Sequence, residues 1–216
     1  MNRANWLVSM VGSLLATTAF AQSGGGVVYE IDGARSDIHW QVYKAGAFAR
    51  FGHNHVVSIG SPSGRVVVAS ELVDSYFEMT IAVDELVVDD PQLRSGKGED
   101  FASEPSAEDI EGTKGNMLSE TVLNGEQYPV IRVRGTRLSG LDSDATLDLT
   151  IELLGRSVTH SVPAHVVIEG DSLTATGEFS LQHEDLGMKP FSVMMGALQV
   201  GEQLDFLYHV HARKAD

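Results

Sequence analysis

Apolar and polar residues alternate with a period of two along most of the chain. Between Leu147 and Leu153 every second residue is apolar, and the positions between them hold Asp148, Thr150 and Glu152. Side chains of a β-strand point alternately to its two faces, so this pattern is typical of a strand with one buried and one solvated face. The same alternation recurs at residues 38–42, 77–83, 131–136, 162–168, 173–181 and 204–213.

Turn signals rich in glycine separate these runs. They lie at residues 60–64, 139–140, 170–171 and 196–201. Shorter strand candidates raise the number of predicted strands to about eight to ten. These candidates lie near residues 27–31, 56–59 and 66–68. Clean alternation predicts antiparallel pairing, because parallel strands buried on both faces are continuously apolar. The pattern therefore predicts an all-β domain, as a sandwich or a closed barrel.

One segment breaks the alternation. Residues 84–111 are rich in acidic residues and contain several glycines and serines and two prolines. We predict a long acidic surface excursion, partly flexible. A short helix is expected to start at Pro105-Ser106 and to stop at Asn124-Gly125. Four of its residues share one apolar face. They are Ile110, Met117, Leu118 and Val122. The chain shows no internal repeat and no second domain.

The first 21 residues have the pattern of a cleaved signal peptide. Arg3 supplies the positive start, residues 7–20 are apolar or small, and Ala19-Phe20-Ala21 forms a small-x-small cleavage pattern. The apolar run is shorter than the roughly 20 residues that a membrane-spanning helix needs. We therefore predict a signal peptide at 1–21, a mature single domain at 22–216, and a periplasmic or secreted location.

Composition narrows the range of partners. The 216 residues include no cysteine, 15 basic and 30 acidic side chains, and the net charge is -15. The absence of cysteine excludes disulfides, thiolate nucleophiles and iron–sulfur clusters. The acidic charge argues against nucleic acid and against electrostatic docking on anionic membranes, because both need clustered basic side chains. The expected partner is small or apolar.

Read in order, the strands and their junctions resemble the YceI-like family, also called the polyisoprenoid-binding or lipocalin-like secreted family. The resemblance rests on residues 29–32, 36–40, 128–131, 158–162, 179–181, 185–188 and 200–204. Two segments depart from the family pattern. Phe51 to His55 replaces a plainer strand start, and residues 84–111 match poorly, without a clear copy of the family's Arg-Asp pair.

The resemblance implies an eight-stranded antiparallel lipocalin-like β-barrel, closed by a helix, whose apolar interior holds an isoprenoid chain such as a quinone tail. The alternation agrees, because eight strands enclose room for side chains or one slender ligand. Ten inward apolar residues are candidates for ligand contact. They are Ile38, Trp40, Val42, Phe77, Met79, Ile81, Phe179, Leu181, Phe206 and Tyr208. By themselves such residues indicate an ordinary core, and only the resemblance to a hollow barrel makes them binding candidates.

Two His-x-His pairs place two imidazoles on one face of a strand. His209 and His211 oppose the apolar parity of their strand and should face solvent. His53 and His55 have three interpretations: ordinary surface or turn residues, hydrogen-bonding partners for a ligand's polar head, or part of a metal site completed by other ligands.

No catalytic motif is present: the chain lacks a Gly-x-Ser-x-Gly elbow, a P-loop and a His-Glu-x-x-His sequence. We therefore predict an exported binding or carrier protein for an isoprenoid-type lipid, without enzymatic activity, cofactor or bound metal. The alternative is a metal-binding protein or metal-dependent enzyme that uses His53 and His55. A structural partner of a membrane redox protein is a third hypothesis. The sequence does not fix the ligand or the oligomeric state.

Overall fold

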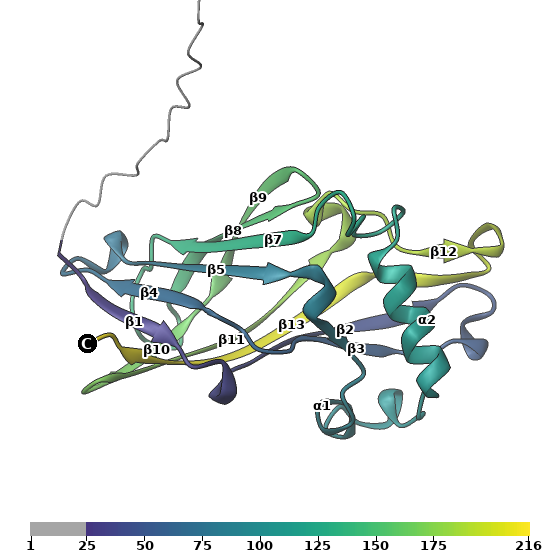
Figure 1. The fold of residues 1–216 in the computed structure, drawn as a ribbon, viewed down its shortest axis with the longest axis horizontal. Coiled ribbons are helices and arrows are strands. Elements are labelled where there is room, and N and C mark those ends of the chain that lie inside the picture. Colours follow the sequence, from purple (N-terminus) through teal and green to yellow (C-terminus); the bar gives the residue numbers. More distant parts are fainter. Residues whose placement is uncertain (1–24) are drawn as a thin grey trace, which may run out of the picture.

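The computed structural model describes residues 25–216 (Figure 1). The predicted signal peptide lies outside the described residues. The described chain is mainly antiparallel β-sheet, with few helices. The strands are β1 (Val27–Ile31), β2 (Asp37–Ala45), β3 (His55–Ile59), β4 (Gly64–Val68), β5 (Tyr76–Ala82), β6 (Leu86–Val88), β7 (Val130–Thr136), β8 (Thr146–Leu153), β9 (Arg156–Pro163), β10 (His165–Glu169), β11 (Ser172–Gln182), β12 (Ser192–Val193) and β13 (Leu198–Lys214).

Two α-helices and seven short 3-10 helices complete the described part of the chain. The α-helices are α1 (Pro91–Ser95) and α2 (Ala107–Leu118). The 3-10 helices are η1 (Gly33–Arg35), η2 (Ala49–Phe51), η3 (Leu72–Asp74), η4 (Val83–Glu85), η5 (Glu99–Phe101), η6 (His183–Leu186) and η7 (Met194–Gly196). No helix in residues 25–216 is long and apolar enough to cross a membrane.

The structure has thirteen strands in this range, more than the eight of the predicted fold. The difference arises because several strands are interrupted. β1 and β2 both pair with β13, and η1 separates them. In the next run, β4 pairs with β1 and β3 pairs with β2. In the run after that, β5 pairs with β4 and β6 pairs with β3. β9 passes directly into β10 at Ala164. With each interrupted run counted once and the two-residue β12 set aside, eight runs remain.

Two cross-strand pairs show why glycine occupies inward positions of the sheet. Gly135 lies opposite Phe77, and Gly177 lies opposite Tyr208. In each pair the aromatic ring lies over the glycine and leaves no room for a Cβ atom. Covering a strand glycine with an aromatic ring restores the packing that its missing side chain would give.

The sheet folds over so that β5, β7 and β8 face β13, β2 and β11 across the interior (Figure 1). The main hydrophobic core lies between these groups and includes Met79 and Leu149 from the first and Leu181 and Leu204 from the second. A smaller core around Tyr29 and the strands β10, β11 and β13 fills the end where the chain terminates.

The acidic segment 84–111 is more ordered than predicted. It forms β6, α1, η5 and the start of α2. Phe101 and Arg94 are buried, at 4% and 7% exposure, and Phe101 packs edge-on against Tyr43 of β2. The segment is therefore a structured excursion held to the sheet by buried contacts, and its partial flexibility stays a prediction. The acidic side chains of Glu99 and Asp100 do face solvent, while apolar and basic side chains turn toward the sheet.

Helix α2 starts where the sequence predicts. The Ser106 side chain accepts from the Asp109 N–H, and the Asp109 carboxylate accepts from the Ser106 N–H, which satisfies free donors of the first turn. The helix ends at Leu118, because Ser119 leaves the helical conformation before the predicted stop at Asn124. The predicted apolar face packs on the main core.

Candidate ligand-binding cavity

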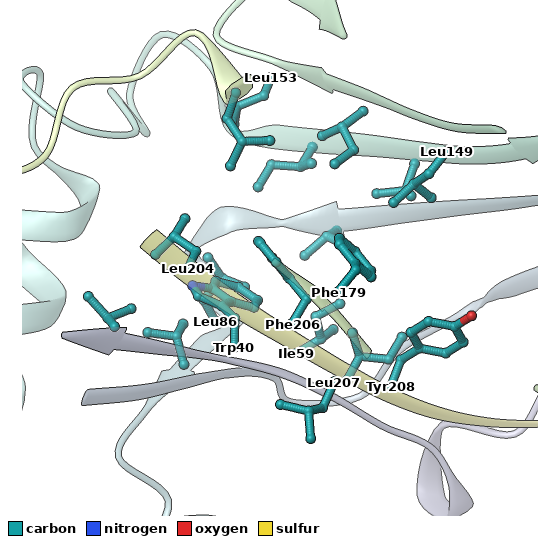
Figure 2. A pocket seen from close by; sticks show the side chains of 18 of the residues that line it. Trp40, Ile59, Leu86, Leu149, Leu153, Phe179, Leu204, Phe206, Leu207 and Tyr208 are labelled. Atoms are coloured by element: carbon teal, nitrogen blue, oxygen red, sulfur yellow. The ribbon is translucent and has the colours of Figure 1, made fainter. Parts of the chain in front are cut away.

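A cavity of about 730 Å³ lies between the two groups of strands. Its walls are mainly apolar side chains, and they come from the strands β1 to β11 and β13 and from helix α2; Figure 2 shows part of this lining. Leu149 and Leu153 of β8 form one wall, opposite Phe179 and Phe206 (Figure 2). Small-molecule sites typically measure roughly 300–1,000 Å³ and are lined mostly by apolar and aromatic groups.

Nearly all of the predicted contact residues line this cavity. From the apolar set they are Ile38, Trp40, Val42, Phe77, Met79, Ile81, Phe179, Phe206 and Tyr208. Leu181 does not line it; the residue is buried at 7% exposure within the main core. The reason is that strand parity identifies the inner face but not which inward side chains meet empty space. Contact of these residues with a ligand remains a prediction.

Three aromatic rings from adjacent strands form a continuous surface in the cavity wall. Phe206 of β13 stacks on Phe179 of β11, with ring centroids 5.0 Å apart and planes 9° from parallel. On its other side, Trp40 of β2 lies 5.8 Å from Phe206 (Figure 2). The register explains the cluster, because Phe206 is the direct partner of both Phe179 and Trp40.

Tyr208 continues this aromatic row along β13. Its ring lies over Gly177, and its hydroxyl donates to the carbonyl of Pro163, 2.6 Å away. Burial raises the pKa of Tyr208 to about 12, so the phenol is neutral at physiological pH. Tyr208 thereby ties β13 to the end of β9, across β11.

The cavity has one polar end, beside α2. His53 and His55 line it from the start of β3. Polar groups of α2 line it from the other side; they are Glu108, Asp109, Thr113 and Asn116. Hydrogen bonds from Ser106 lower the pKa of Asp109, with smaller contributions from the charges of His53 and His55. A ligand with an apolar body and a polar head could therefore place its body against the apolar walls and its head beside these polar side chains.

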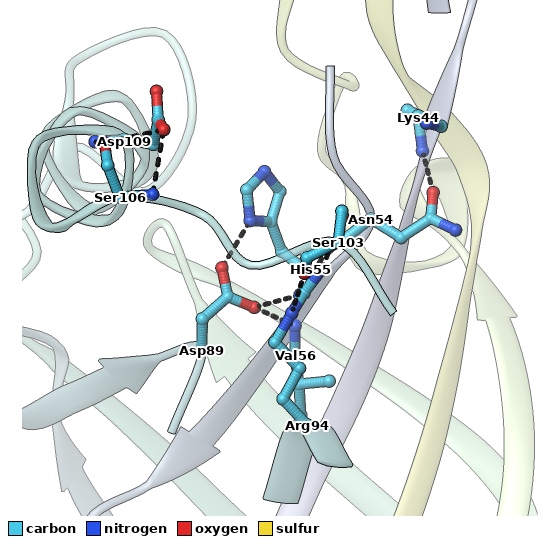
Figure 3. Close-up of polar contacts among 9 residues, drawn as sticks. All are labelled: Lys44, Asn54, His55, Val56, Asp89, Arg94, Ser103, Ser106 and Asp109. Atoms are coloured by element: carbon cyan, nitrogen blue, oxygen red, sulfur yellow. Dashed lines mark hydrogen bonds and ion pairs between the residues drawn. The ribbon is translucent and has the colours of Figure 1, made fainter. Parts of the chain in front are cut away.

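His55 is held by a buried ion-pair network (Figure 3). Its Nδ1 lies 2.6 Å from Oδ2 of Asp89, and Oδ1 of Asp89 accepts from the Val56 N–H at 2.9 Å and from Arg94 at 2.7 Å. Arg94 also donates to the carbonyls of Asn54 and Ser103. Asp89 is 3% exposed.

The sequence reasoning missed this network. An Arg–Asp pair lies within 84–111, where the sequence did not show one clearly, and it joins Arg94 to Asp89. The residue before α1, Asp90, caps the helix and places Arg94 one turn later. The only signal in the sequence was the spacing of an Arg five residues after an Asp. The fold then brings both side chains against the start of β3.

The pKa of Asp89 reflects opposing effects. Burial alone would raise it, but the hydrogen bonds from His55 and from the Val56 N–H, together with the charges of His55 and Arg94, outweigh burial and lower it. Asp89 is therefore a charged acceptor, and the contact with His55 requires a proton on Nδ1. This leaves Nε2 free for a ligand's polar group: it accepts a hydrogen bond in the neutral ring and donates one in the protonated ring.

The geometry gives little support to a metal site at the histidine pair. The rings of His53 and His55 have centroids 6.2 Å apart, and Nδ1 of His55 is engaged by Asp89. Among residues 25–216 no group of three or more His, Asp or Glu side chains is arranged to hold a metal ion. His209 and His211 lie on the outer face of β13, and His209 is exposed.

A comparison with family models matches residues 29–212 to the YceI-like domain. The chain belongs to the YceI-like domain family. Members of this family are binding proteins and are generally not enzymes. Among curated proteins, no sequence matches this YceI-like chain.

Solved structures share the fold of this YceI-like protein. Burkholderia cenocepacia BcnA has a TM-score of 0.60 at 12% identity, over 84% of this chain and 98% of BcnA. The Campylobacter jejuni YCEI protein has a TM-score of 0.53 at 8% identity, over 74% of this chain and 85% of its own. At these identities the similarity shows the fold alone.

Proposed function

We propose that this YceI-like protein is an exported carrier that holds the apolar tail of an isoprenoid-type lipid, such as a prenyl quinone, in its cavity. The observation that carries the proposal is the cavity itself, whose lining is mainly apolar and includes a group of polar side chains from α2 and the start of β3. Family membership supports binding of a small hydrophobic ligand and a role without catalysis.

The proposal includes closure of the sheet into an eight-stranded barrel. β8 pairs with β9, β10 pairs with β11, and only Ala164 separates β9 from β10, so the two form one stretch of chain. The hydrogen bond from the Tyr208 hydroxyl to the Pro163 carbonyl, at the junction of β9 and β10, supports closure. A closed barrel would shield the lipid tail from water on all sides.

Burial of the tail would supply the binding free energy. Each Å² of apolar surface removed from water contributes about 25 cal/mol. The stacked rings of Phe179 and Phe206, extended by Trp40, offer a flat surface for conjugated or branched hydrocarbon. The polar head would lie near His53 and His55, where Nε2 of His55 can exchange a hydrogen bond with it, as acceptor in the neutral ring and as donor in the protonated ring.

Trp40 provides the direct test. In the chain that starts at Gln22 it is the single tryptophan, because Trp6 belongs to the predicted signal peptide. We expect a water-dispersed short-chain prenyl quinone to quench Trp40 fluorescence and saturate near one molecule per chain. A Trp40→Phe variant gives the contribution of the tyrosines to the emission, and free N-acetyltryptophanamide titrated with the same quinone controls for collisional quenching and light absorption outside the cavity. Emission that stays unchanged at saturating quinone would contradict the proposal.

A further inference from the structure

Five large apolar side chains are exposed at one end of the molecule, and we call them the apolar tip. Three are more than half exposed: Met195 at 106%, Phe51 at 66% and Met194 at 63%. Phe48 and Val193 add 37% each. All five come from two connections, the one around η2 and the one from β12 to η7.

The two connections form one structural unit. The N–H of Phe48 donates to the carbonyl of Ala197 at 2.7 Å, and Phe48 and Phe51 pack edge-on at 6.1 Å. Gly46 has a φ of 91°, and a Cβ there would clash with the Ala197 backbone. The tip is therefore a fixed projection built from segments far apart in sequence.

The methionines of the tip are held in an uncommon conformation. Met194 and Met195 have φ values of 52° and 56°, in the left-handed region that residues with a Cβ seldom adopt. Two consecutive apolar residues in this region, with both side chains turned into solvent, gain no packing that would explain the strain. Such strain gathers at functional sites.

The two chain segments that form the tip carry no acidic side chain of their own, in contrast to the composition of the whole protein. Residues 44–55 and 186–201 contain no acidic residue, although the chain has twice as many acidic as basic residues. Their basic residues are Lys44, Arg50 and Lys189, and the guanidinium of Arg50 lies 4.5 Å from the Phe51 ring centroid. The net acidic charge, which argues against docking on anionic membranes, therefore comes from residues outside these two segments.

The tip also adjoins the cavity. Phe51 belongs to both, and Phe191 and Leu198, next to the tip methionines in the chain, line the cavity as well. Apolar residues of the tip and of the chain beside it therefore form part of the cavity wall. A lipid leaving the cavity past these residues would contact apolar side chains.

We propose that the apolar tip inserts into the surface of a phospholipid bilayer, and that the carried lipid passes between bilayer and cavity at this end. The inference rests on the proposed function. Exposed aromatic and methionine side chains would enter the interface, while Lys44, Arg50 and Lys189 would lie near anionic phosphates. The acidic remainder of the surface would keep the other faces away from the membrane.

The test uses the chain from Gln22 onward and vesicles of phosphatidylethanolamine and phosphatidylglycerol in a flotation assay. The variant is Met194→Asn with Met195→Asn, because asparagine tolerates the left-handed conformation and removes the apolar surface. Neither methionine lines the cavity. The matched control is Val73→Asn, which removes an exposed apolar side chain, 55% accessible, from η3 outside the tip.

We expect wild type and Val73→Asn to float with the vesicles and the methionine double variant to bind about tenfold more weakly. Quinone binding without vesicles, followed by Trp40 fluorescence, should be equal in all three, which separates this inference from the proposed function. If wild type does not float with the vesicles, the inference is overturned, and the apolar tip would instead be a contact surface for a protein partner or for a second copy of this chain. Equal flotation of the double variant would overturn it too.

Discussion

Asp89 is the residue on which the polar end of the cavity depends. Its buried carboxylate fixes the His55 ring, and the charge is compensated by Arg94 on its other oxygen. Removing one partner of such a group leaves an uncompensated charge away from water. The residue has a φ of 55°, which asparagine also tolerates, so a charge change can be made without a backbone change.

We expect Asp89→Asn to lower the free energy of unfolding by about 3–5 kcal/mol, because Arg94 would keep a buried charge without its counterion. Urea denaturation measures the difference. The control is Glu152→Gln, whose partner Arg132 lies 4.0 Å away on the surface, and it should change stability by less than about 1 kcal/mol. Equal effects of the two substitutions would contradict the account of the network.

Asp89 also predicts a dependence on pH. Its folded-state pKa is lower than the ordinary value of 3.8, so its contribution is complete well above that value. The contribution is lost as pH falls through 3.8 toward the folded-state value, because the unfolded chain takes up the proton first. The stability difference between wild type and Asp89→Asn should therefore shrink on acidification. An Asp with a lowered pKa titrates on folding and unfolding roughly between pH 6 and pH 3. If the difference in unfolding free energy between the two proteins stays constant or grows as the pH falls through this range, the account of Asp89 is refuted.

At the scale of elements, the two faces of one strand allow a matched test of the cavity. Val133 of β7 lines the cavity, and its neighbour Arg132 is on the outer face, with its side chain 65% exposed. A phenylalanine at Val133 adds volume where the tail would lie, while one at Arg132 adds it outside.

We expect Val133→Phe to weaken prenyl quinone binding at least about tenfold, or by about 1.4 kcal/mol, because part of the tail loses its space. Arg132→Phe should bind as wild type does. Trp40 quenching gives both affinities, and thermal unfolding checks that each variant is folded. Unchanged affinity in Val133→Phe would place the ligand elsewhere.

Alternation alone predicted most strands, because one face of each is buried and the other is wet. It located β8, where apolar residues alternate with Asp148 and Glu152. The helical spacing of apolar residues, together with the start signal at Ser106, located the apolar face of α2. Alternation could not predict the helices and strand within residues 84–111, because their packing depends on a contact between Phe101 and Tyr43 of the distant strand β2.

All of the predicted contact residues except Leu181 line the cavity, but many other lining residues were not named, because parity does not show where the interior is empty. Asp89 and Arg94 were missed because local sequence does not show burial of a charge.

For the whole molecule, the proposed function requires export. We expect the full-length chain, expressed in a Gram-negative bacterium, to be recovered from the periplasm with Gln22 as its first residue. Intact-mass spectrometry gives the start of the chain. An Ala21→Leu substitution should leave the precursor unprocessed, because the cleavage site needs a small residue. A wild-type chain that keeps residues 1–21 and stays in the cytoplasm would contradict a periplasmic carrier.

The central claim is that one prenyl lipid occupies the cavity. The most direct measurement is solvent extraction of tag-free protein, purified from the periplasm of its own source, followed by mass spectrometry of the extract. We predict a prenyl lipid near one molecule per chain in wild type and a strongly reduced amount in folded Val133→Phe. Folded wild-type protein that yields no lipid, or the same amount from both proteins, would contradict the account.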